Sequence, residues 1–209
     1  MSDVFLILHG WGGNKPAHWQ EWLGEKLRAE GLTVHAPKME NPTNPDPTAW
    51  MALIHETLKQ VPTDATLTVL THSMGAINWM RHAAMSQNAG FQRPGPVADR
   101  VLLVAPPYVV KEIPPLDLAG TAVFFPPVLS SAGLQAVGQE TVLVASDTDD
   151  YSTFDQSSAY AAGLGLEIQK LPNAGHISPY YGYGEWPWVL DWCRRRAGLP
   201  PMPNGETMS

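Results

Sequence analysis

The stretch that decides the fold is Leu67-Thr68-Val69-Leu70-Thr71-His72-Ser73-Met74-Gly75-Ala76. Residues 67–70 have the pattern of a buried strand, and the residues after Ser73 continue directly into a helical pattern. A serine at such a junction fits the nucleophile elbow, G-x-S-x-G, in which a sharp strand-to-helix turn exposes the hydroxyl above the sheet. Gly75 supplies one of the small residues, whereas Thr71 is larger than the glycine of the pattern. The alternative interpretation is a serine that only caps a helix.

Around this stretch, short apolar runs alternate with helical patterns, as in β-α-β units that build a mainly parallel sheet. Uninterrupted runs are typical of strands covered on both faces. The uninterrupted runs are residues 4–8, 67–70, 101–105 and 141–145, and a further strand is expected over residues 166–171. The apolar stripes at helical spacing are residues 19–27, 50–58 and 186–193. We therefore predict an α/β fold with helices on both faces of the sheet.

Length and composition limit the alternatives. The 209 residues suit one domain, and a 44% hydrophobic content argues against a disordered chain despite 20 prolines, which we place in loops. The lone Cys193 excludes an internal disulfide, and a net charge of −7 argues against a nucleic-acid partner. With no signal-like or membrane-spanning run, we expect a cytoplasmic protein that does not enter a membrane.

A serine nucleophile needs a base, and the base needs an acid that orients it. The run ending at residue 145 leads into three aspartates, Asp147, Asp149 and Asp150, and the run ending at residue 171 leads into His176. Serine, aspartate and histidine thus follow in the order that the elbow motif requires. We choose Asp149 as the acid and keep Asp147 and Asp150 as alternatives. His72, although next to Ser73, is expected to point elsewhere.

Two other site types fit the sequence poorly. No pair of histidines has the short spacing of a zinc site. If Asp147 opened a calcium loop, the required glycine and glutamate would be Ser152 and Ser158. We therefore expect neither a metal nor another cofactor.

The charge that develops on a substrate carbonyl oxygen needs two backbone N–H donors. The N–H of Met74, directly after the candidate nucleophile, is one candidate. The second is the N–H of Trp11 in the loop after the first strand, where glycines allow the backbone to approach a ligand. A phosphate-binding loop is the rival, but residues 8–13 lack both the G-x-G-x-x-G pattern and a P-loop lysine.

Longer stretches resemble the small serine hydrolases related to retinoblastoma-binding protein 9, over roughly residues 4–196. The two most specific to that family are His18-Trp19-Gln20-x-Trp22 and Gly182-x-Gly184-Glu185-Trp186-Pro187. Others are His9-Gly10-Trp11-Gly12-Gly13, Thr48-Ala49-Trp50, His72-Ser73-Met74-Gly75-Ala76, Leu103-Val104-Ala105-Pro106-Pro107 and Gly175-His176-Ile177.

The resemblance implies a compact α/β-hydrolase without a lid domain, which we assign to residues 1–197. Residues 198–209 have neither periodicity nor core material, and we expect them to form a flexible tail. It also implies carboxylesterase-like or related acyl-hydrolase activity, with Ser73 and His176 at the family's catalytic positions. The family's acid usually precedes a proline, and here Asp150 stands in that place after Asp149. The implied partner is a small ester or amide, and short acyl esters are the cautious expectation. A hydrolase fold that serves as a protein-binding module is the alternative.

The aromatic residues divide into two groups. Four tryptophans at helical spacing are expected in the core: Trp19, Trp22, Trp50 and Trp186. Four aromatic residues in loops near the candidate catalytic turns are expected to contact substrate: Trp11, Tyr108, Tyr180 and Tyr181.

Overall fold

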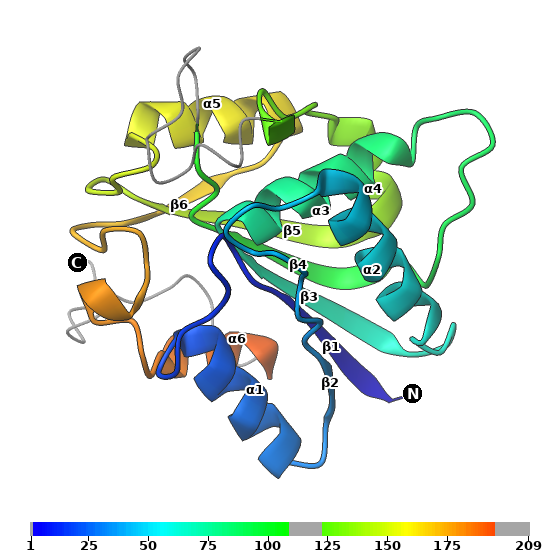
Figure 1. Ribbon diagram of the computed structural model, residues 1–209, viewed down its shortest axis with the longest axis horizontal. Coiled ribbons are helices and arrows are strands. Elements are labelled where there is room, and N and C mark those ends of the chain that lie inside the picture. The colour runs from blue at the N-terminus through cyan, green and yellow to red at the C-terminus, as the bar shows by residue number, and fades with distance from the viewer. Residues whose placement is uncertain (1, 109–122, 195–209) are drawn as a thin grey trace.

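The computed structural model describes residues 2–108 and 123–194. Its centre is a six-stranded parallel sheet with the strand order β2-β1-β3-β4-β5-β6 (Figure 1). The strands are β1 (Asp3–Leu8), β2 (Thr33–His35), β3 (Thr66–His72), β4 (Ala98–Val104), β5 (Gly138–Ser146) and β6 (Ile168–Leu171).

Helices cover both faces of this sheet (Figure 1). On one face lie α2 (Pro47–Lys59), α3 (Met74–Met85), α4 (Ser131–Val137) and α5 (Phe154–Leu164). On the other lie α1 (Trp19–Ala29) and α6 (Pro187–Cys193), with the short 3-10 helix η2 (Pro179–Tyr181) preceding α6. The predicted single-domain α/β fold is confirmed.

The alternation of side chains along a strand explains why the apolar runs are uninterrupted. In β1, Val4 and Leu6 pack under α2 and α3, while Phe5 and Ile7 pack under α1 and α6. Because neighbouring residues of a strand point to opposite faces, a sheet covered on both sides needs apolar residues at every position. The core expected around the tryptophans is also present, since Trp19, Trp50 and Trp186 are buried and Trp22 is partly buried.

Two expectations fall wholly or partly outside the described residues. The predicted tail, residues 198–209, lies outside them. The absence of a lid also depends on residues 109–122, between β4 and α4, which are not described. No helix in the described ranges is both long and apolar enough to cross a membrane.

The parallel arrangement fixes where a site can form. The loops that follow β1, β3, β5 and β6 all leave the same edge of the sheet, because their strands run in the same direction. Ligands of open parallel sheets bind at this carboxyl edge. Candidate residues that are far apart in the sequence therefore meet here.

Candidate active site

Ser73 occupies the sharp turn between β3 and α3. Its backbone has φ 54° and ψ −123°, a conformation that non-glycine residues rarely adopt. Its N–H donates to the Val104 carbonyl at 2.9 Å, which ties the turn to the end of β4. The side chain makes no capping hydrogen bond to α3, so its hydroxyl is directed to other partners.

Two glycines allow this turn to pack against the loop after β1. A Cβ atom on Gly75 would lie 2.3 Å from the Leu8 carbonyl oxygen, and one on Gly10 would lie 2.7 Å from the Ser73 Cβ. Both distances are too short for any side chain. Thr71, where the motif has its other glycine, is fully buried and its hydroxyl donates to the Leu102 carbonyl at 3.0 Å. The larger residue is therefore accommodated by a hydrogen bond inside the sheet.

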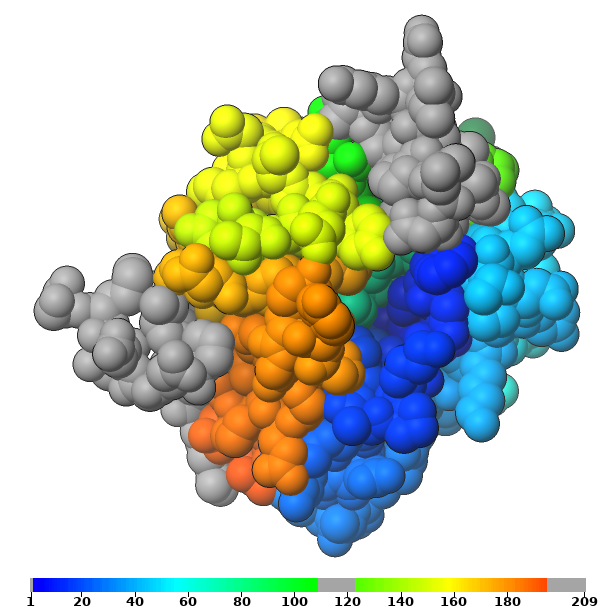
Figure 2. All heavy atoms as spheres, turned by 60° about the vertical axis from the view of Figure 1, so that its left-hand side comes forward, coloured from blue at the N-terminus to red at the C-terminus, as the bar shows by residue number. Residues whose placement is uncertain are grey.

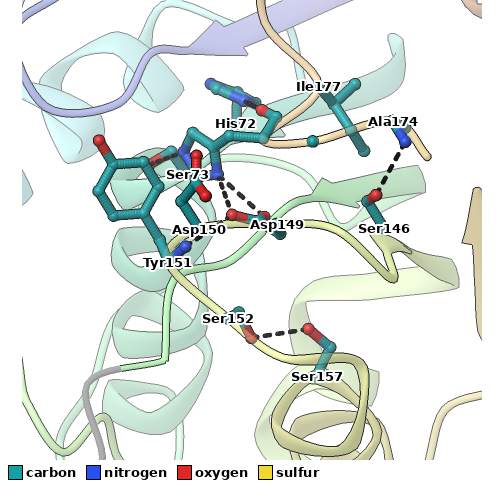
Figure 3. Close-up of polar contacts among 12 residues, drawn as sticks. His72, Ser73, Ser146, Asp149, Asp150, Tyr151, Ser152, Ser157, Ala174 and Ile177 are labelled. Carbon is teal, nitrogen blue, oxygen red and sulfur yellow. Dashed lines mark hydrogen bonds and ion pairs between the residues drawn. The ribbon is translucent and has the colours of Figure 1, made fainter. Parts of the chain in front are cut away.

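Ser73, His176 and Asp149 form a continuous hydrogen-bonded chain. The Ser73 hydroxyl lies 3.0 Å from His176 Nε2, and His176 Nδ1 lies 2.9 and 3.0 Å from the two Asp149 carboxylate oxygens. The Asp149 side chain is 1% exposed and also accepts the backbone N–H of Tyr151 at 2.9 Å. Figure 3 shows Ser73, Asp149 and Tyr151 grouped around these contacts.

The three neighbouring aspartates have different partners. Asp149 alone among them contacts the imidazole of His176. Asp147 accepts the backbone N–H of Asn173 and pairs with Lys170, and both bonds lower the pKa of its carboxyl group. Asp150 accepts a hydrogen bond from the Tyr181 hydroxyl, which is the main reason that the pKa of Tyr181 rises to about 12.

The loop that carries Asp149 also holds the loop that carries His176. Three consecutive backbone N–H groups, those of Asn173, Ala174 and Gly175, donate to side chains at positions 147, 146 and 148, at distances of 2.8, 3.0 and 3.0 Å. The contact between Ser146 and Ala174 is drawn in Figure 3. These three hydrogen bonds between the loops, together with the contact between Asp149 and His176, thus fix the position of the acid relative to the base.

His72 does not point away from the site, contrary to the expectation from the sequence. Its ring lies 4.9 Å from the His176 ring between centroids, and its Nε2–H donates to the His176 carbonyl at 2.9 Å. Burial holds the pKa of His72 well below its usual value, and His18 and His176 lower it further. The expectation failed because the loop that bears His176 folds back over the end of β3 and contacts the His72 ring.

A cavity of about 320 Å³ opens beside Ser73. The segments that border it meet on one face of the molecule, where the early residues are blue, those near 150 yellow and those near 180 orange (Figure 2). It is lined by Gly10, Trp11, Gly13, Asn14, Lys15, His18, His72, Ser73, Tyr151, His176, Ser178, Pro179 and Tyr180.

Only part of the predicted aromatic lining borders this cavity. Trp11 and Tyr180 lie on it, whereas Tyr108 packs against Tyr160 with 4.7 Å between ring centroids and Tyr181 leans over Gly175. The sequence interpretation missed Tyr151, whose ring lies 4.5 Å from that of His176. No local motif marks that contact, because it depends on how the acid loop turns after β5.

Two further sequence expectations concern the backbone donors and the metal. Trp11 lies on the cavity wall, with its indole N–H held by the Thr43 carbonyl at 3.1 Å, and Met74 is the first residue of α3. The N–H groups of a first helical turn have no acceptor inside the helix.

Over the two described ranges, no three histidine, cysteine or acidic residues are grouped so that they could hold a metal ion.

Known proteins resemble this chain in both sequence and structure. YdeN of Bacillus subtilis (strain 168) is 22% identical over 194 residues, which cover 91% of this chain and 94% of YdeN. The structure of the ydeN gene product matches with a TM-score of 0.74 at 19% identity, over 94% of this chain and 98% of that one. The structure of Est1E from Butyrivibrio proteoclasticus with ferulic acid bound gives a TM-score of 0.62 at 12% identity, over 92% and 87% of the two chains.

These structural similarities are at low identity and show the fold. The family is shown by a match of residues 5–195 to the family described as serine hydrolase. The match covers most of the chain, including the turn at Ser73 and the loops that bear Asp149 and His176. The chain therefore belongs to the serine hydrolase family of the α/β-hydrolases.

Proposed function

We propose that this protein hydrolyses small carboxylic esters through an acyl-enzyme formed on Ser73. The observation that carries the proposal is the hydrogen-bonded chain from Ser73 through His176 to the buried Asp149. His176 Nε2 takes the hydroxyl proton as Ser73 Oγ attacks the ester carbonyl, and Asp149 orients the imidazole and stabilises its protonated form.

The tetrahedral intermediate then collapses with loss of the alcohol. The proton on His176 passes to the leaving oxygen, and the acyl group remains on Ser73 Oγ. A water molecule, deprotonated by His176, attacks the acyl-enzyme and releases the carboxylic acid and free Ser73. In both steps the backbone N–H groups of Trp11 and Met74 are the proposed donors to the negatively charged oxygen.

The proposed substrates are short acyl esters. The cavity beside Ser73 has a volume of about 320 Å³, at the lower end of the range for small-molecule sites. Trp11 and Tyr180 border it and are proposed to contact the acyl or alcohol group. Tyr108 and Tyr181 do not border it and are not proposed as substrate contacts.

Labelling with a fluorophosphonate probe tests the nucleophile. The wild-type protein should react and Ser73→Ala should not, while p-nitrophenyl acetate and butyrate should be hydrolysed only by the wild type. Labelling that persists in Ser73→Ala would contradict the role of Ser73. A folded wild type that neither labels nor hydrolyses these esters would contradict the proposed activity.

A further inference from the structure

His18 stands at the N-terminus of α1 and is almost entirely buried, with 5% of its surface exposed. Its Nδ1 accepts the backbone N–H of Gln20 at 3.2 Å, which caps the helix. Serine, threonine, aspartate and asparagine are the residues that usually perform this task. A histidine can accept the same hydrogen bond with one ring nitrogen, Nδ1, and its second ring nitrogen, Nε2, then remains available for another partner.

The capping bond decides which nitrogen of His18 carries the proton. An acceptor at Nδ1 requires a lone pair there, so the neutral ring has its proton on Nε2. The ring stays neutral near pH 7, because burial, followed by the nearby His176 and His9, lowers the pKa of His18 to about 4. Within residues 2–108 and 123–194, no group accepts a hydrogen bond from this Nε2–H.

The residue lies on the wall of the cavity that contains Ser73. Its ring centroid is 4.9 Å from that of His72, which is in turn 4.9 Å from that of His176. The His72 ring thus lies between this donor and the proposed general base, His176. All three residues line one cavity, so one small substrate there can reach both the donor and the base. Nε2 is not among the fully buried polar atoms that lack a partner in the described ranges, so this donor is accessible from the cavity that His18 lines.

We propose that His18 Nε2–H is a specificity-determining hydrogen-bond donor for a neutral oxygen of the substrate. The preferred esters carry a carbonyl, ether or hydroxyl oxygen beyond the ester group itself, in place of an all-carbon chain. This inference rests on the proposed ester hydrolysis. A neutral ring offers no charge to attract a carboxylate, so its contribution is directional.

The variant His18→Asn separates the two functions of the residue. Asparagine is among the best capping residues, so its side-chain oxygen replaces Nδ1 as the acceptor for the Gln20 N–H. Its NH2 group is a donor, but with the side-chain oxygen at the place of Nδ1 it lies at the place of Cδ2, so no donor remains at the place of Nε2. The control is Asp46→Ala, which removes the side-chain cap of α2, an exposed site that does not border the cavity.

The measurement compares paired p-nitrophenyl and alkyl esters in which one methylene of the acyl or alcohol chain is replaced by an ether oxygen, at each position that is not bonded directly to the ester group. For each pair we take the ratio of kcat/KM for the oxygen-containing ester to kcat/KM for the all-carbon ester. The two esters differ in intrinsic reactivity, but this difference is the same for every variant and cancels when the ratios of two variants are compared. For at least one position we expect this ratio to fall about 3- to 10-fold in His18→Asn, the loss expected for one hydrogen bond. The ratio should not change in Asp46→Ala.

Equal ratios in wild type and His18→Asn at every position would overturn the inference, provided that the wild type reacts with the fluorophosphonate probe. A wild type that does not react would instead contradict the proposed hydrolase activity. If His18→Asn does not fold, His18→Ser retains a capping hydroxyl and is judged by the same ratios.

Discussion

The hydroxyl of Ser146, at the end of β5, accepts the backbone N–H of Ala174 at 3.0 Å, two residues before His176. Both residues are fully buried. In Ser146→Ala this N–H loses its acceptor, so we expect the free energy of unfolding to fall by about 1–3 kcal/mol. We also expect kcat to fall, because the loop that positions His176 loses an anchor. Urea denaturation and p-nitrophenyl acetate kinetics measure the two effects.

The matched control is Ser158→Ala, which removes a hydroxyl that donates to the Phe154 carbonyl within α5. It should leave kcat unchanged. A kcat that is equally reduced in both variants would contradict a specific role of the contact between Ser146 and Ala174.

The roles of the three aspartates can be separated by changing each to asparagine. Asp149→Asn should lower kcat by roughly 10,000-fold, because the amide no longer holds the imidazole in the productive tautomer. Asp147→Asn and Asp150→Asn retain side-chain acceptors for Asn173 and Tyr181, and should lower kcat by less than about 10-fold. Steady-state kinetics of the wild type and the three variants with one ester, p-nitrophenyl acetate, measures these losses in kcat. Similar losses in all three variants would contradict the assignment of Asp149.

Acid should destabilise the protein as soon as the pH falls below about 6.5. Burial is the main cause of lowered pKa values in His9, His18, His55, His72 and His82. For His82 the folded-state pKa is about 3, against about 6.5 in the unfolded chain. Between these values the unfolded state binds a proton that the folded state does not, so stability is complete above pH 6.5 and decreases toward pH 3.

His82, which is almost entirely buried, contributes up to about 1.4 kcal/mol per pH unit in this window. Urea unfolding at pH 6.5, 5.5 and 4.5 should therefore give a falling free energy of unfolding, and His82→Gln should show a shallower fall. An unchanged slope in His82→Gln would show that His82 is not one of the residues responsible.

Replacement of Gly75 by alanine should destabilise the protein by on the order of 3 kcal/mol. The new Cβ would lie 2.3 Å from the Leu8 carbonyl oxygen and 2.9 Å from that of His9, and backbone atoms cannot move aside cheaply. Gly31→Asn is the control, because that position has a φ of +78° that asparagine tolerates and no neighbour within 4 Å. Thermal denaturation compares the two, and equal changes in Tm would contradict the steric argument.

The sequence was most informative where one physical requirement acts along a continuous segment. Strands buried on both faces need apolar residues at every position, so β1, β4 and β5 were evident as runs. The three-residue β2 was not among these runs, because it lies at the sheet edge and none of its residues is fully buried. The meeting of Ser73, Asp149 and His176 also followed from chain order, since loops after parallel strands share an edge.

Residues placed by packing between elements could not be predicted in this way. The contact of His72 with the His176 backbone depends on the path of residues 172–178, and no spacing in the sequence encodes it. For the same reason, the sequence did not reveal that Tyr151 borders the cavity beside Ser73 while Tyr108 and Tyr181 do not. The sequence placed His18 in a family motif, but only its capping bond defines which ring nitrogen carries the proton.

The strand β6 has only four residues and, among the strands of the described ranges, pairs only with β5. Short edge segments are the parts of a protein that open locally at the lowest free energy, without global unfolding. The loop after β6 carries His176, so such an opening would separate the base from Ser73 while β1, β3 and β4 stay paired. Catalytic competence is therefore expected to be lost at lower urea concentration than the sheet itself, and hydrogen exchange should be faster in residues 168–176 than in β3.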